Sequence, residues 1–210
     1  MTEPDTVMTR TGQGMELSQR GEREAARRWL AEVWHDIGGE SGDPFHRCAL
    51  AHAMADVQDD VQEELAWDLR ALEAADLITG ERAAQAGVTG PASGFYPSLH
   101  LNLAECYGKL GEFDRAREHL QRGRAAVGAL GDDGYGRMVK GAVLTGWLSD
   151  WPPSDRRGEV GEQAGRPLPR SCPVPWPLVD AFGEGTPWRT VSTLHPVRVP
   201  ARCRRRSCAG

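Results

Sequence analysis

The chain has 210 residues, 40% of them hydrophobic, which is enough to form one ordinary folded domain without a metal or a disulfide. Its net charge of −5 is unevenly distributed, because residues 1–151 carry 25 acidic and 15 basic side chains, whereas residues 152–210 carry 5 acidic and 10 basic ones. The acidic larger part argues against a DNA-binding surface, since phosphate recognition requires a positive field, and we predict no specific nucleic-acid binding.

The N-terminal segment MTEPDTVMTRTGQG is polar where a signal peptide needs an apolar stretch, and no run of 18 apolar residues occurs. We therefore expect no membrane span and a cytoplasmic location. The five cysteines have no paired short spacings. Cys48 and Cys106 fall on predicted buried helix faces, which favours reduced core residues.

The first predicted helix pair spans residues 12–38, with Gly21 at its turn. One face of the second helix carries Ala26, Leu30, Val33 and Ile37. Gly12 and Gly14 interrupt the first helix, and each glycine costs roughly 1 kcal/mol relative to alanine, so we expect this helix to be weak.

A second pair is predicted over residues 43–77. Asp43 can cap its first helix, and Pro44 suits the first helical position because its missing N–H would lack a partner there. The inner stripe of the two helices is predicted to consist of Leu50, Met54, Val57, Leu65, Leu69 and Leu72. Residues 79–95, rich in Gly, Ala, Ser and Thr, follow as a flexible insertion; loops of this length are often lids or disordered, and we favour disorder.

The third pair, predicted over residues 96–128, has the most regular pattern. Gly111 marks its turn. The apolar stripes of its two helices consist of Leu99, Leu103, Cys106, Leu110, Phe113, Ala116, Leu120 and Val127. A capping helix is predicted at residues 134–149, with Tyr135, Met138, Val139, Val143 and Trp147 at helical spacing.

The third pair resembles the tetratricopeptide repeat. The order and spacing typical of that repeat are shown by Leu103, Ala104, Tyr107, Gly111, Phe113 and Ala116. The resemblance extends over roughly residues 15–150, and two of its segments also look like bacterial tetratricopeptide proteins from GC-rich, actinobacterial-like genomes. It implies an all-α fold for residues 1–151, a short right-handed solenoid of antiparallel helix pairs ending in the capping helix.

Arrays of this family bind peptides or protein segments in a concave groove lined by the first helix of each pair. The resemblance implies a groove faced by His46, Asp56, Ser98, Leu101, Asn102, Glu105 and Lys109. Some members hold a C-terminal carboxylate with Lys, Arg and Asn side chains. Here Asp56 and Glu105 would repel a carboxylate, which argues against such a clamp.

Two other groups of residues have a functional and a structural interpretation. His52 and Asp56, four residues apart, suit a pair of metal ligands, but this spacing is common in surface pairs and no HExxH pattern accompanies it. The arginines at positions 20, 23, 27 and 28 recur at helical spacing and suit an acidic peptide or a phosphate. The glutamates interleaved with them favour ion pairs within the helix instead.

The sequence contains no nucleophile elbow, phosphate-binding loop or paired-carboxylate motif, so we predict no enzymatic activity and no cofactor. The leading hypothesis is a noncatalytic protein–protein interaction module, a scaffold or regulator with a peptide or protein partner. One alternative is a ligand-sensing regulatory fragment related to a larger transcriptional or signalling protein. The other is a metal-dependent enzyme centred on His52 and Asp56.

Residues 152–210 differ in composition from the rest, with ten of the fourteen prolines, three cysteines and no lysine. They show no helical or alternating periodicity, so we predict a disordered, basic tail. A second hypothesis is that a reading-frame shift near Asp150 produced this segment, because Arg, Pro, Gly, Ala, Trp and Cys are typical of out-of-frame GC-rich codons.

Overall fold

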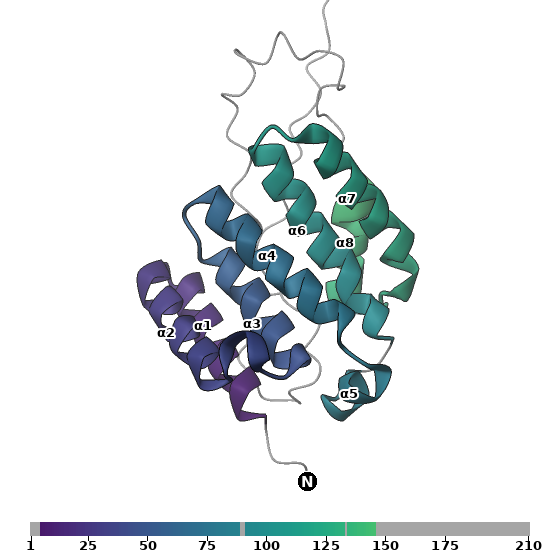
Figure 1. The fold of residues 1–210 in the computed structure, drawn as a ribbon. Helices are drawn as coiled ribbons and strands as arrows, with labels where there is room; N and C mark the ends of the chain where they lie inside the picture. Colours follow the sequence, from purple (N-terminus) through teal and green to yellow (C-terminus); the bar gives the residue numbers. More distant parts are fainter. Residues whose placement is uncertain (1–4, 89–90, 133, 146–210) are drawn as a thin grey trace, which may run out of the picture.

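The computed structural model describes residues 5–88, 91–132 and 134–145, and within these ranges the chain is all-helical, without strands (Figure 1). The α-helices are α1 (Thr6–Gln19), α2 (Arg23–Asp36), α3 (Pro44–Asp56), α4 (Val61–Asp76), α5 (Gly80–Gln85), α6 (Tyr96–Lys109), α7 (Phe113–Ala126) and α8 (Gly134–Thr145). Short 3₁₀ turns occupy Gly39–Ser41, Ala92–Phe95 and Val127–Ala129. The predicted all-α helical-repeat fold is confirmed.

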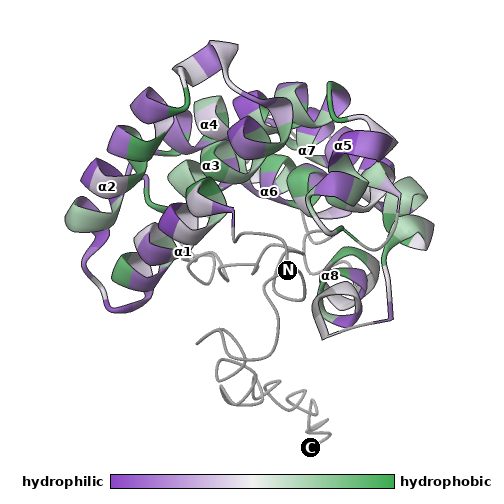
Figure 2. Cartoon of the chain, turned by 90° about the horizontal axis from the view of Figure 1, so that it is seen from below, coloured by the Kyte–Doolittle hydropathy of each residue, from purple (hydrophilic) through white to green (hydrophobic). Residues whose placement is uncertain are grey.

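Three antiparallel pairs, α1/α2, α3/α4 and α6/α7, are stacked in chain order and followed by α8. The second helix of each pair also packs against the first helix of the next one. Figure 2 shows the result as an arc, with α1, α3, α6 and α8 along its inner side and α2, α4 and α7 along its outer side. The first helices of the pairs therefore face the hollow of the arc.

The turns of the first and third pairs have the same geometry. Gly21 has a φ of 83° and Gly111 a φ of 77°, a left-handed conformation that costs other residues about 1–2 kcal/mol. The following N–H, of Glu22 or Glu112, donates to the carbonyl five residues earlier at 2.9 or 2.8 Å. These bonds close the C-terminal end of each first helix in the same way.

The middle pair turns without a glycine, and arginines from α2 stabilise its turn. Arg27 donates to the carbonyl of Val57 and Arg23 to that of Gln58, and both guanidinium groups also bind the Asp59 carboxylate. These arginines therefore join the first pair to the second, whereas the prediction was ion pairs within their own helix. Local pairing is found for the other two arginines of the cluster, at positions 20 and 28.

Gly14 lies where α1 and α2 come closest. A Cβ atom added to Gly14 would lie 2.5 Å from Cδ2 of the fully buried Leu30. The glycine that the sequence marked as a weakness of α1 therefore has a packing role, because no larger residue fits against α2 at this point.

Residues 79–95 are more ordered than expected. Their described part contains α5 and a 3₁₀ turn, with Ala83 and Phe95 buried in the core. The Arg82 guanidinium donates two hydrogen bonds of 2.8 Å to Asp43 and lies over the ring of Phe45. The insertion is thus fixed to the start of α3 through contacts between residues distant in sequence; residues 89 and 90 lie outside the described residues.

Helix α8 covers the exposed side of the third pair. Val139 and Val143 are fully buried against Leu101 and Leu120. This burial supplies the apolar partner that the last pair of a stack requires. Trp147, the end of the predicted capping helix, the tail at 152–210 and the reading-frame hypothesis all lie outside the described residues.

Candidate partner-binding groove

Four of the residues predicted for the groove lie on α3 and α6, two helices of the inner side of the arc. Asp56 ends α3, and Asn102, Glu105 and Lys109 follow one another along α6 at spacings of three and four. Asp56, Asn102 and Lys109 are half-buried, and Glu105 retains 7% of its exposure. These four side chains form the polar part of the candidate groove.

The other three predicted residues have structural contacts. Ser98 is fully buried and its hydroxyl donates to the carbonyl of Phe95, while Leu101 packs in the core beneath α8. Neither side chain faces the groove, because the 3₁₀ turn and α8 cover this end of α6. His46 is half-buried, with Nε2 2.7 Å from Oδ2 of Asp5, the residue that caps α1.

A buried aspartate, Asp68 of α4, lies behind the groove. One oxygen is 3.7 Å from Nδ1 of His52 and accepts from Asn102 at 3.5 Å, and the other accepts from the Cys106 thiol at 3.6 Å. Asp68 thus joins three helices through polar contacts. Sequence reasoning missed it, placing Leu69 on the inner stripe, yet Leu69 is 41% exposed. Leu65, Asp68 and Leu72 lie at helical spacing, so the sequence could have indicated a buried Asp68. That interpretation would have placed an aspartate in an otherwise apolar stripe.

A lysine bridges two acidic groups at the C-terminal end of α6. Lys109 Nζ lies 2.9 and 3.0 Å from the two oxygens of Glu64 and 3.0 Å from Oε1 of Glu105. Burial raises the pKa of Glu105, and the nearby Lys109 opposes that rise. This ammonium group offsets part of the negative charge of the site.

Asp56 lacks such compensation. Its Oδ2 atom is inaccessible to solvent and has no hydrogen-bond partner among the described residues. Burial raises the pKa of Asp56 to about 7, with His52 opposing the rise and the carboxylates at positions 68, 64 and 105 adding to it. The ionised form of Asp56 is therefore disfavoured in the folded protein.

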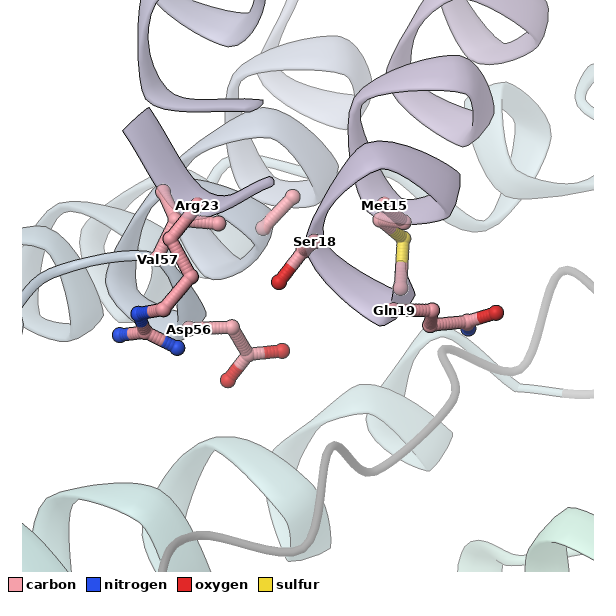
Figure 3. A pocket seen from close by; sticks show the side chains of 7 residues that line it. Met15, Ser18, Gln19, Arg23, Asp56 and Val57 are labelled. Atoms are coloured by element: carbon pink, nitrogen blue, oxygen red, sulfur yellow. The ribbon is translucent and has the colours of Figure 1, made fainter. Parts of the chain in front are cut away.

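A cavity of about 240 Å³ opens between α1, α2 and α3, beside Asp56. It is lined by Met15, Ser18, Gln19, Arg23, Ala53, Asp56 and Val57. Figure 3 shows the Asp56 and Ser18 side chains directed toward the space between these helices. The wall is part apolar and part polar, with one carboxylate among its polar groups.

Within the described residues, three side chains that could bind a metal lie close together. They are Glu64, Asp68 and Cys106, and their donor atoms lie within 4.8 Å of one another. They already bind each other and the lysine, however. Glu64 is bound to Lys109, and burial followed by the charge of Asp68 strongly raises the pKa of the Cys106 thiol. A protonated thiol that donates to Asp68 fits a structural network better than a metal site.

The arrangement of three stacked helix pairs followed by α8 defines the chain as a stacked helical-repeat protein. A family model described as tetratricopeptide repeat matches residues 7–32 and 97–122, which include most of α1/α2 and α6/α7. These two matches support a protein of the tetratricopeptide repeat type. A comparison with curated proteins and another with solved structures each found no match.

The two matched segments are offset by 90 residues, which places Gly21 on Gly111 and Ala26 on Ala116. Both alanines are fully buried. Tetratricopeptide repeats generally mediate protein–protein interaction, and the family is typically noncatalytic. The actinobacterial-like type stays a prediction. In the described part of the chain, no helix has the length and apolarity needed to cross a membrane.

Proposed function

We propose that this protein is a noncatalytic scaffold or regulator that holds a peptide or protein partner in the groove formed by α1, α3 and α6. The proposal depends mainly on one observation. Asp56, Asn102, Glu105 and Lys109 come from α3 and α6, two successive first helices, and Asp56 also lines an open cavity. A convergent set of polar groups beside an apolar wall is what recognition of an extended segment requires.

The size of the cavity bears on the alternative of a ligand-sensing fragment. Pockets for small molecules usually have volumes of about 300–1,000 Å³. The cavity beside Asp56, at about 240 Å³, is smaller and suits a single side chain of a partner better than a whole cofactor. We therefore favour a protein partner, and a cytoplasmic location remains our expectation.

The proposal can be tested by recovering partners from a lysate of the source organism with the immobilised full-length chain. The test variant combines Asn102→Ala with Glu105→Gln, which changes the groove and keeps the size of the glutamate. A matched control is Glu73→Gln, an exposed position on α4. We expect the groove variant to lose the partner and the control to retain it, with helical circular dichroism unchanged in both. Equal recovery by all three proteins would contradict the proposal.

A further inference from the structure

We propose that the partner segment is basic and that one of its lysine or arginine side chains enters the cavity beside Asp56. This inference rests on the proposed function, because it names the chemistry of the segment that the groove would hold. It is the opposite of a carboxylate clamp, in which the groove would present cations to an anionic peptide end.

The site carries more carboxyl groups than cationic groups that bind them. Four carboxyl groups lie close together, Asp56, Glu64, Asp68 and Glu105, and Lys109 is the ammonium group that binds two of them. His52 lowers the pKa of Asp56 but is itself fully buried beside Asp68. The cluster therefore retains excess negative charge, and a partner cation would offset it.

The arginine in the cavity wall does not supply that cation. Arg23 donates Nη2 to the Gln58 carbonyl at 2.7 Å and Nε to Asp59 at 3.2 Å. These contacts hold its guanidinium at the turn of the middle pair. Asp56 forms no ion pair with it, although both residues line the cavity.

One carboxylate oxygen of Asp56 lacks a hydrogen-bond partner among the described residues. A buried acceptor without a hydrogen bond typically costs about 1–3 kcal/mol, and a charged group costs more. Oδ2 of Asp56 is such an acceptor within the described residues. A small shift of the Asp56 side chain toward an entering ammonium or guanidinium group would replace the missing partner with a charge-assisted hydrogen bond.

The cavity wall combines apolar side chains with oxygen acceptors. Met15, Ala53 and Val57 provide apolar contacts for a hydrocarbon stem, and Ser18 and Gln19 offer further oxygen acceptors near the carboxylate of Asp56. Lysine and arginine combine such a stem with a cationic head. An acidic side chain would not be stabilised in this cavity, because the carboxylates around Asp56 would repel its negative charge.

The charge of Asp56 makes binding depend on pH. Protons compete with the partner cation for this carboxylate, whose raised pKa of about 7 reflects burial and the acidic groups of α4 and α6. Affinity should therefore increase from pH 6 to pH 8. Lys109 and Glu64 already bind each other in the free protein.

The test is a selection of random 12-residue peptides displayed on phage against the full-length chain, followed by calorimetry with the most enriched peptide. We expect lysine and arginine to be enriched over aspartate and glutamate. Asp56→Asn should weaken binding of this peptide at least tenfold at pH 8, whereas Glu73→Gln should leave it within twofold. Wild-type affinity should be at least fivefold higher at pH 8 than at pH 6.

The other outcomes separate a failure of this inference from a failure of the proposed function. Enrichment of neutral or acidic peptides that still require Asn102 and Glu105 would overturn this inference and leave the proposed function standing. Failure to enrich any peptide would count against both. If Asp56→Asn lost its helical circular dichroism, the wild-type protein would decide, since an affinity unchanged between pH 6 and pH 8 would refute a role for the Asp56 charge.

Discussion

Replacing Asp56 with asparagine should stabilise the free protein at alkaline pH. The folded protein raises the pKa of Asp56 from 3.8 to about 7, mainly through burial and then through nearby carboxylates. Between these two pH values the folded state binds a proton more readily than the unfolded chain does. The contribution of Asp56 to stability therefore falls as pH rises through this window.

The two pKa values give a loss of about 2–3 kcal/mol between pH 5 and pH 8. Asparagine has nearly the same shape and does not ionise, so Asp56→Asn should escape this loss. Urea unfolding followed by circular dichroism at pH 5, 6, 7 and 8 would measure it for the variant, the wild type and the exposed control Glu73→Gln. We expect the free energy of unfolding of the variant to exceed that of the wild type by about 2–3 kcal/mol more at pH 8 than at pH 5.

A constant difference between Asp56→Asn and wild type across this pH range would refute the reasoning. It would mean that Asp56 is already stabilised as a carboxylate in the free protein, and the argument for a missing cation would fail with it. A pH-dependent gain confined to Asp56→Asn would instead identify a carboxylate retained at a cost in stability, as expected of a group that serves binding.

Three further predictions concern the scaffold. Gly14→Ala should lower the free energy of unfolding by about 1 kcal/mol, because the clash with Leu30 outweighs the gain in helix propensity. If urea unfolding showed that the variant is more stable than the wild type, α1 and α2 would be able to move apart at no cost. Gly111→Ala should cost about 1 kcal/mol because of its positive φ, whereas the exposed Gly128→Ala should be nearly neutral, so equal effects would contradict the turn argument. Burial, followed by the charge of a neighbouring histidine, lowers the pKa of His100 to about 4, so its stabilising contribution is complete above pH 6.5 and falls by about 2–3 kcal/mol as pH decreases toward 4. His100→Phe should reduce this acid sensitivity in urea unfolding, and an unchanged pH profile would exclude the imidazole as its source.

The groove is a prediction from the family resemblance, and the structure shows that Ser98 and Leu101, two of its expected residues, are buried. Asp56, Asn102, Glu105 and Lys109 were identified from spacing and family resemblance. The pattern could not show that Ser98 and Leu101 are covered, because their covering comes from the 3₁₀ turn and from α8. It also could not identify Asp68, since a carboxylate becomes tolerable in a core only when side chains from other helices bind it.

The sequence by itself determined the helices of the three pairs, the capping helix and the two glycine turns. These depend on local physics: apolar periodicity, capping side chains, and the low cost of a positive φ at Gly21 and Gly111. Tertiary structure decided the packing role of Gly14 and the anchoring of α5 by Arg82. It also left Oδ2 of Asp56 without a hydrogen-bond partner among the described residues. Each of these depends on atoms from helices far apart in the chain, whose distances and burial are set only when the pairs stack.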